Sequence, residues 1–307
     1  MPDNFEIHSE ENNHVVDTIE GVDNTRTPGY VPPIGTGENI DPNDVTVTIA
    51  DTSTPVVILF GAPSIGKTMI LRRLILYLQK DYFIQPDTLF INSPQELVDD
   101  YKKRCSDFNA TIHSQYAAKG NGDRDFMLVS VYKNGRPIVQ ILEAPGEHYF
   151  NKRFPNANFP PYINTIISAP NKKIWCYITQ LGWENSQDIR NDYSRKIKQM
   201  QSINLSSRDK VIFISNAADL QPQYSTSNGP IVQSYFNDTR LQFPGIFQSY
   251  INNNPITKLW KPYNFTFIPF STGSYSPIRD GSGRQTYVPG QAVYPAMLWQ
   301  AILKARG

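Results

Sequence analysis

Residues 55–68 read PVVILFGAPSIGKT, and this stretch predicts both the fold and a ligand. The apolar, β-branched run 56–60 has the composition of a buried strand. It leads directly into the pattern Gly-x-x-x-x-Gly-Lys-Thr at residues 61–68. An amphipathic helical pattern follows to about residue 79, so strand, glycine-rich loop and helix together predict a phosphate-binding loop.

Each residue type in this loop has a chemical reason. The glycines let the backbone adopt positive φ and approach a phosphate closely, and the helix behind directs its positive dipole end to the same place. Lys67 would bring an ammonium group to the β- and γ-phosphates, and the Thr68 hydroxyl would bind Mg²⁺. The residues expected to line the phosphates are Gly61, Ala62, Pro63, Ser64, Ile65, Gly66, Lys67 and Thr68.

Length and charge divide the chain into a tail and a body. The 307 residues allow one large or two small domains. Residues 1–54 hold 11 acidic residues and one basic residue, while the remaining 28 basic and 17 acidic residues give the body a balance of +11. We expect an acidic, disordered tail over 1–43 and a folded domain over 44–307. The scattered lysines and arginines form no tight run, so nucleic-acid binding is not supported.

Several classes of protein are not favoured by the sequence. The N-terminus lacks the charged and apolar regions of a signal peptide, and no apolar run approaches the ~20 residues that span a bilayer. Cys105 and Cys176 are far apart, and Cys176 lies in a strand-like run, so we expect a buried free thiol and a cytoplasmic protein. The four histidines show no metal-ligand spacing, so we expect no structural zinc.

Periodicity predicts the other elements and an α/β fold. A hairpin is expected over 126–144, where two strand-like runs flank Asn134-Gly135, a pair favoured in tight turns. Other strands are expected at 45–50, 174–180, 211–215 and 265–270, and helices at 95–117, 161–168, 186–201 and 293–305. An insertion over 221–262 is expected to hold a short helix near 241–251. The sheet is therefore mostly parallel, with one antiparallel hairpin strand and helices on both faces.

The order of motifs resembles that of the Ras-like GTPases of the translation-factor class. In that family a P-loop precedes a hairpin ending in Asp-x-x-Gly, and later strands end in Asn-Lys-x-Asp and in a Ser-Ala-Lys-like turn. The matching positions here are EAPG at 143–146, NAAD at 216–219 and STG at 271–273. The string LEAPGEHYF also resembles a segment of bacterial double-GTPase-type proteins. The resemblance covers about residues 55–305 and implies the three-layer α/β/α sandwich of P-loop NTPases.

The resemblance also implies roles for the matched residues. Glu143 would hold the Mg²⁺ shell, and the Gly146 backbone N–H would contact the γ-phosphate, so that the loop after it senses hydrolysis. Asn216 would brace the base loop. Asp219 would accept hydrogen bonds from guanine N1–H and N2–H₂, a pair of donors that adenine lacks. The backbone N–H groups that would close over the base belong to Ser271, Thr272 and Gly273.

The chain departs from the family pattern at several positions. Glu143 replaces aspartate, and Ala217 replaces the family's lysine. Glu147 stands where the family often has a water-positioning glutamine, with His148 as a substitute. Together with Lys67 these are the candidate catalytic residues.

The switch threonine that the family carries shortly before the hairpin is missing from 119–125, and Thr111, a candidate for it, lies about 15 residues before the hairpin. Arg72 and Arg73 are expected to be surface charges rather than an arginine finger, and a finger, if one is used, would come from a partner. These gaps concern hydrolysis more than nucleotide binding.

Three functions are compatible with these residues. The leading interpretation is a Mg²⁺-dependent protein that binds GTP and GDP, hydrolyses GTP slowly and acts as a switch on a protein effector or under a protein activator. The alternatives are a scaffold module with a nucleotide that is not turned over, and a P-loop ATPase or small-molecule kinase with an acceptor site in 221–262.

Overall fold

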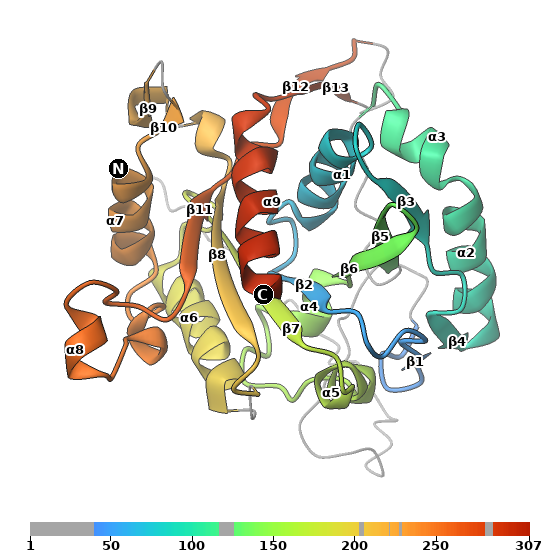
Figure 1. Cartoon of the computed structure of the whole chain (residues 1–307), viewed down its shortest axis with the longest axis horizontal. Coiled ribbons are helices and arrows are strands. Elements are labelled where there is room, and N and C mark those ends of the chain that lie inside the picture. Colours follow the sequence, from blue (N-terminus) through green and yellow to red (C-terminus); the bar gives the residue numbers. More distant parts are fainter. Residues whose placement is uncertain (1–39, 117–125, 203–205, 221, 227–228, 280–284) are drawn as a thin grey trace, which may run out of the picture.

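A seven-stranded sheet forms the centre of the computed structural model, which describes residues 40–116, 126–202, 206–220, 222–226, 229–279 and 285–307 (Figure 1). In spatial order the strands are β11 (Thr266–Pro269), β8 (Lys210–Asn216), β7 (Lys173–Gln180), β2 (Val56–Phe60), β6 (Arg136–Glu143), β5 (Met127–Lys133) and β3 (Phe83–Pro86). Neighbours from β11 to β6 are parallel, and β5 is antiparallel to both β6 and β3. The predicted mostly parallel sheet with one antiparallel hairpin strand is confirmed.

Local sequence explains the centre of this sheet. Every residue of β2 is buried, as expected of a strand covered on both faces. At the β5–β6 turn, Asn134 and Gly135 both have positive φ, 51° and 72°, which matches the twist of the two strands. Register follows from this turn, with Lys133 opposite Arg136 and Met127 opposite Glu143.

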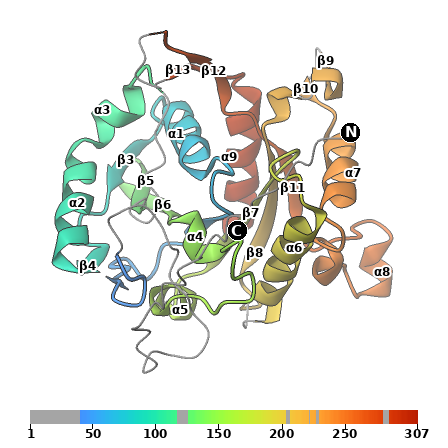
Figure 2. The same ribbon diagram turned by 180° about the vertical axis from the view of Figure 1, so that it is seen from behind.

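Helices cover both faces of the sheet, which confirms the predicted three-layer sandwich. One face carries α1 (Lys67–Leu78) and α9 (Val293–Arg306), and the other carries α4 (Gly146–Tyr149), α5 (Pro161–Ser168) and α6 (Gln187–Ser202), as the two opposite views show (Figures 1 and 2). The remaining helices are α2 (Gln95–Ser106), α3 (Phe108–His113), α7 (Val232–Gln242) and α8 (Pro255–Lys258). Cys105 and Cys176 are buried free thiols, as predicted for Cys176.

In the described part of the chain, three short antiparallel ribbons lie outside the main sheet. They are β1 (Thr46–Val47) with β4 (Ile91–Ser93), β9 (Ser225–Thr226) with β10 (Gly229–Pro230), and β12 (Gly273–Pro277) with β13 (Gln285–Pro289). The β12–β13 hairpin begins at Gly273, the last residue of the segment 271–273 that the sequence predicts to close over the base. Among the described residues, no helix has both the length and the hydrophobicity needed to cross a bilayer.

Several sequence predictions need correction. The helix expected over 95–117 divides at Asp107 into α2 and α3. The strand expected at 45–50 has two residues and pairs with β4 outside the main sheet. The helix expected near 241–251 is wrong, because α7 ends at Gln242 and Pro244-Gly245 follow, with Gly245 at φ 76°. Residues 1–39 of the expected tail and all of residues 119–125, where the switch threonine was sought, lie outside the described residues.

Candidate functional site

The glycine-rich loop joins the carboxyl end of β2 to the first turn of α1. Ser64 and Gly66 both have positive φ, 59° and 91°, and Gly66 is the residue that caps α1. Positive φ at alternate positions turns successive backbone N–H groups toward one point, which is the geometry of an anion-binding loop. Glycine is required at position 66 because of its positive φ. It is also required because a side chain there would collide with the amide nitrogen of Asn216.

Lys67 and Thr68 are the first two residues of α1, directly after this loop. Lys67 is 7% exposed, and its Nζ donates to the carbonyl oxygens of Gly61 and Ala62, both at 3.2 Å. The ammonium group is therefore held inside the loop by two backbone carbonyls. The Thr68 hydroxyl donates a short hydrogen bond to Oε1 of the buried Glu143 at the end of β6. The two residues predicted from the sequence as metal ligands are thus in contact.

Gly146 packs directly on the phosphate-binding loop. A Cβ at this position would lie 2.6 Å from Lys67 Nζ, 2.6 Å from Pro63 N and 2.7 Å from Ala62 C. No side chain fits in this space, because two of the three neighbours are backbone atoms. The β6–α4 turn and the phosphate-binding loop therefore form one surface around the lysine.

His148 lies beneath that surface in α4. Its Nδ1 is 2.9 Å from the Tyr162 hydroxyl, and its ring is 2% exposed. Burial, with a smaller contribution from the nearby Lys67 charge, lowers the pKa of His148 to about 3, so the imidazole is neutral. Within the described chain its Nε2 has no hydrogen-bond partner. Glu147 is half-buried in the first turn of α4.

Replacement of His148 by glutamine is expected to reduce the fall in the free energy of unfolding as the pH is lowered below 6.5. The native pKa lies below the unfolded value of 6.5, so the unfolded chain takes up the proton first and stability is lost as the pH falls from 6.5 toward 3. One proton corresponds to about 1.4 kcal/mol per pH unit. Urea unfolding at several acidic pH values measures this slope. The exposed His113→Gln variant is the control, and equal slopes in all three proteins would contradict the prediction.

The predicted base loop is assembled from the ends of β8 and β11. Asp219 is exposed, and its Oδ1 accepts a hydrogen bond of 2.7 Å from the hydroxyl of the buried Ser271. The Ala218 N–H donates to Phe270 O at 2.9 Å, and the Ala218 carbonyl accepts from the Tyr235 hydroxyl at 2.9 Å. The turn is thus fixed from two sides, while the aspartate carboxylate faces outward.

Asn216 connects this turn to the phosphate-binding loop. Its Nδ2 donates to Ile65 O at 3.0 Å, and its side chain is 5% exposed. The family resemblance predicts that Asn216 braces the loop around the base. In the structure, the Asn216 side chain is hydrogen-bonded to the glycine-rich loop 61–68. The two regions that the sequence separates by about 150 residues therefore form one continuous site.

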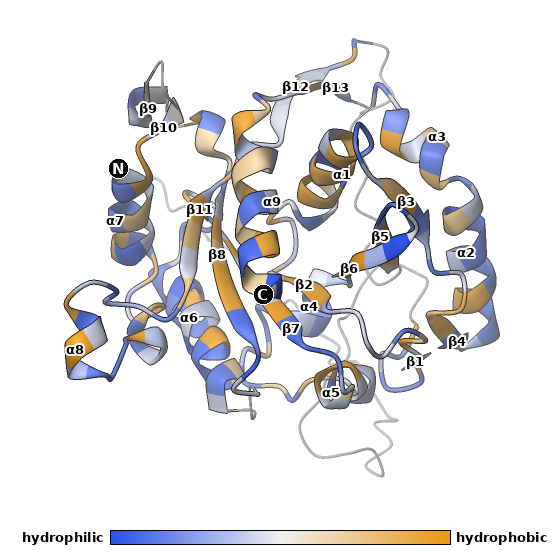
Figure 3. Cartoon of the chain, viewed as in Figure 1, coloured by the Kyte–Doolittle hydropathy of each residue, from blue (hydrophilic) through white to orange (hydrophobic). Residues whose placement is uncertain are grey.

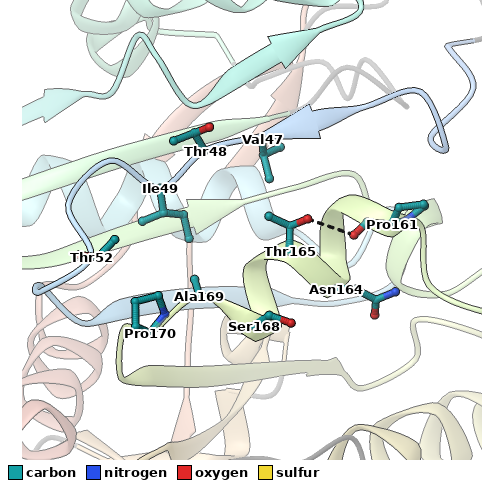
Figure 4. A pocket seen from close by; sticks show the side chains of 10 residues that line it. All are labelled: Val47, Thr48, Ile49, Thr52, Pro161, Asn164, Thr165, Ser168, Ala169 and Pro170. Atoms are coloured by element: carbon teal, nitrogen blue, oxygen red, sulfur yellow. Dashed lines mark hydrogen bonds between the residues drawn. The ribbon is translucent and has the colours of Figure 1, made fainter.

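Two cavities of the described structure are large enough to hold a small ligand. One of about 310 Å³ lies beside Asp219, Ser271 and Gly273, between the β12–β13 hairpin and the start of α9. The other, of about 570 Å³, lies between the segment 47–52 and α5, near the amino end of β7 (Figure 4). Figure 4 shows its lining of Val47, Ile49, Thr165 and other uncharged side chains. No ionisable side chain lines the larger cavity, so it offers no cation to pair with a polyphosphate.

Trp183, after β7, was not identified from the sequence. Its indole N–H donates to Pro63 O at 3.0 Å and so holds the outer side of the phosphate loop. Lys152 lies 4.8 Å from the indole ring centre and pairs with Glu184 at 2.7 Å. A lone tryptophan after a strand carries no sequence signal for this contact.

The prediction that Arg72 and Arg73 are surface charges is wrong. Arg72 is 3% exposed and donates to the carbonyls of Ile112 at 3.0 Å, Tyr116 at 2.5 Å and Ser114 by a shorter bond. Its guanidinium also lies 4.6 Å from the ring centre of Tyr287. Arg73 donates to Gly290 O at 2.6 Å. Both arginines therefore donate to backbone carbonyls that are buried or partly buried.

Tyr287 continues this network to the base loop. Its hydroxyl donates to Thr272 O at 2.7 Å, and its backbone N–H donates to Gln115 O at 2.8 Å. Tyr116 also pairs with Thr286 as an antiparallel bridge. The β12–β13 hairpin therefore joins the base loop to the segment that follows α3.

Arg72→Met is expected to lower the free energy of unfolding by about 2–4 kcal/mol, because one buried and two partly buried carbonyls lose their donor. Methionine keeps the helix propensity and most of the volume, so the loss reports the guanidinium. Chemical denaturation measures it. The exposed Arg306→Met substitution is the matched control, and a loss below about 1 kcal/mol for Arg72→Met would contradict this account of the network.

Comparisons with known proteins give a limited result. No protein-family model matches the chain, and no curated protein matches it. Among solved structures, it is similar to a protein from Plasmodium falciparum described as nucleolar GTP-binding protein 1, with 14% identity and a TM-score of 0.39 over 84% of this chain and 90% of that one. At this TM-score the likeness carries no inference about the ligand of this chain.

Proposed function

We propose that this protein binds a guanine nucleoside triphosphate across the P-loop and the base loop. The observation that carries the proposal is the Asn216 hydrogen bond to Ile65 O, which brings the base loop beside a loop built for phosphate. Both lie at the carboxyl ends of the parallel strands, where open α/β sheets bind ligands. The motif order of a P-loop GTPase supports the same assignment.

The base loop supports guanine as the base. The exposed Asp219 carboxylate is held by Ser271 at 2.7 Å and retains acceptor capacity for two donors side by side. Guanine presents N1–H and N2–H₂ along one edge, whereas adenine does not. The cavity beside Asp219 and Gly273 gives this edge of the site open space.

Thr68 and Glu143 fit a magnesium ion. A hydroxyl and a carboxylate are the hard oxygen ligands that Mg²⁺ takes when phosphates and water supply the rest. No cluster of three or more acidic, histidine or cysteine side chains suited to a metal occurs among the described residues, in keeping with an ion held largely by nucleotide. When bound, Mg²⁺ would neutralise charge on the phosphates.

We propose that hydrolysis is slow. Lys67 and the loop N–H groups can stabilise charge on a transferring phosphoryl group. The segment after Gly146, which the family resemblance assigns to sensing hydrolysis, carries His148, Tyr149 and Phe150, all buried. Rearrangement of this segment would expose those rings to water.

The same observation favours a second candidate function, a scaffold in which the nucleotide is structural. Single-turnover hydrolysis with excess protein separates the two functions. A protein effector or activator stays a prediction.

A titration of fluorescently labelled GTP, GDP and ATP, with and without Mg²⁺, tests the proposal. We expect GTP and GDP to bind at least tenfold more tightly than ATP, because guanine offers Asp219 two adjacent donors and adenine does not. Mg²⁺ should strengthen GTP binding most, because it would neutralise charge on the triphosphate. Absence of binding by all three nucleotides would overturn the proposal, while preference for ATP would overturn the guanine assignment alone.

A further inference from the structure

The three most exposed large apolar side chains of the described residues lie on one loop, residues 251–263. Ile256 is 74% exposed, Leu259 81% and Trp260 87%. Isolated apolar residues on a surface are ordinary, but three within five residues of sequence mark a contact surface. The loop contains α8, which projects from the side of the fold beyond β11 (Figure 3).

The loop is firmly built. Ile251 and Tyr263 pair as an antiparallel bridge at its neck. Asn252, 7% exposed, occupies its interior: its Nδ2 donates to Thr257 Oγ1 at 2.8 Å and to Lys261 O at 3.0 Å, while its backbone N–H donates to Pro262 O at 2.9 Å. The loop therefore encloses polar groups and turns its apolar side chains outward.

Aromatic packing fixes the neck to the domain. The Tyr263 ring lies 5.1 Å from Phe265 and 5.5 Å from Phe236, which stacks on Phe247 at 4.8 Å. Because the neck is anchored and the interior is hydrogen-bonded, the outward orientation of the apolar residues is a defined feature of the surface.

The charge around these residues indicates what they contact. Lys258 and Lys261 are exposed beside them. The sequence from 239 to 279 contains no acidic residue but holds Arg240, Lys258, Lys261 and Arg279. Apolar side chains flanked by cations suit a surface that is anionic outside and apolar beneath, which describes a bilayer containing anionic lipids. Tryptophan is enriched at that interface, because its ring is apolar and its N–H is polar.

We infer that the 251–263 loop inserts Ile256, Leu259 and Trp260 into the surface of an anionic lipid membrane, with Lys258 and Lys261 on the lipid headgroups. The loop precedes β11, so it lies at the amino ends of the parallel strands, opposite the P-loop. The nucleotide site stays accessible to solvent, and the inference is independent of the proposed nucleotide.

Vesicle sedimentation of the full chain tests this inference. We expect binding to phosphatidylcholine vesicles that contain phosphatidylserine, and weaker binding to phosphatidylcholine alone. Brominated acyl chains should quench part of the tryptophan emission, since Trp260 is the exposed indole. The double substitution Leu259→Ser and Trp260→Ser should weaken binding roughly tenfold or more. Lys258→Glu with Lys261→Glu should have a similar effect on anionic vesicles only.

Two matched variants control for general effects. Leu241→Ser removes another exposed leucine, and Lys80→Glu reverses another exposed lysine; both should bind as the unchanged protein does. Failure of the unchanged protein to bind anionic vesicles would overturn the inference. So would equal binding by the Leu259/Trp260 variant, or self-association that depends on these residues without vesicle binding, which would assign the loop to a protein contact.

Discussion

Lys67→Ala is expected to weaken GTP binding by roughly 100-fold or more. The side chain supplies the ammonium group inside the phosphate loop, where it is 7% exposed and already aligned by two carbonyl oxygens. Hydrogen bonds to charged groups contribute about 1.5–3 kcal/mol each, and several phosphate contacts would be lost together. Titration with labelled GTP measures the change.

The control for this experiment is Lys80→Ala, an exposed lysine two residues beyond the end of α1. It should leave the affinity unchanged. Gly146→Ala provides an independent test, since a Cβ there would press on Lys67 Nζ and on the backbone of residues 62–63. If Lys67→Ala binds GTP within threefold of the unchanged protein while remaining folded, the P-loop is not the phosphate site.

Asp219→Asn is expected to exchange guanine for xanthine specificity. An asparagine oxygen can still accept from N1–H, but its amide would face the guanine N2–H₂ group donor to donor. Xanthine carries an oxygen at that position and accepts the amide instead. GTP affinity should fall by roughly 100-fold, and XTP affinity should rise by a comparable factor.

Competition between GTP, XTP and ATP for a labelled nucleotide measures this exchange. Asp81→Asn, at an exposed position after α1, is the control and should change nothing. Ser271→Ala should weaken GTP binding modestly, because Asp219 would lose the hydroxyl that holds it at 2.7 Å. An Asp219→Asn protein with unchanged preferences would contradict guanine recognition by this carboxylate, without affecting the triphosphate site.

The sequence could predict the parts of this molecule that short-range patterns specify. The buried run of β2, the Gly66–Lys67 helix start and the Asn134-Gly135 turn depend on neighbours within a few residues. The order of strands along the chain then places the Asn216 and Ser271 turns at the same edge as the P-loop. The proximity of Asp219 to Ser271 follows from that order.

Long-range burial of polar groups could not be predicted in the same way. Two adjacent arginines on a helix read as solvated charges, yet the acceptors of Arg72 lie 40 to 44 residues away and the acceptor of Arg73 lies 217 residues away. The burial of His148 likewise depends on Tyr162 in the next helix. Only one residue of the edge strand β3, Ile84, is buried. A strand with a single buried residue has no alternation of apolar and polar residues from which it could be predicted.

The Asn216 bond has a consequence for the energetics of ligand capture. The Asn216 hydrogen bond to Ile65 O holds the two loops together, so the proposed nucleotide would meet both halves of its site at a fixed separation. Little entropy is then spent on ordering the receptor. Association should proceed without a slow rearrangement of the protein. Differences in affinity among nucleotides should therefore arise mainly from their dissociation rates.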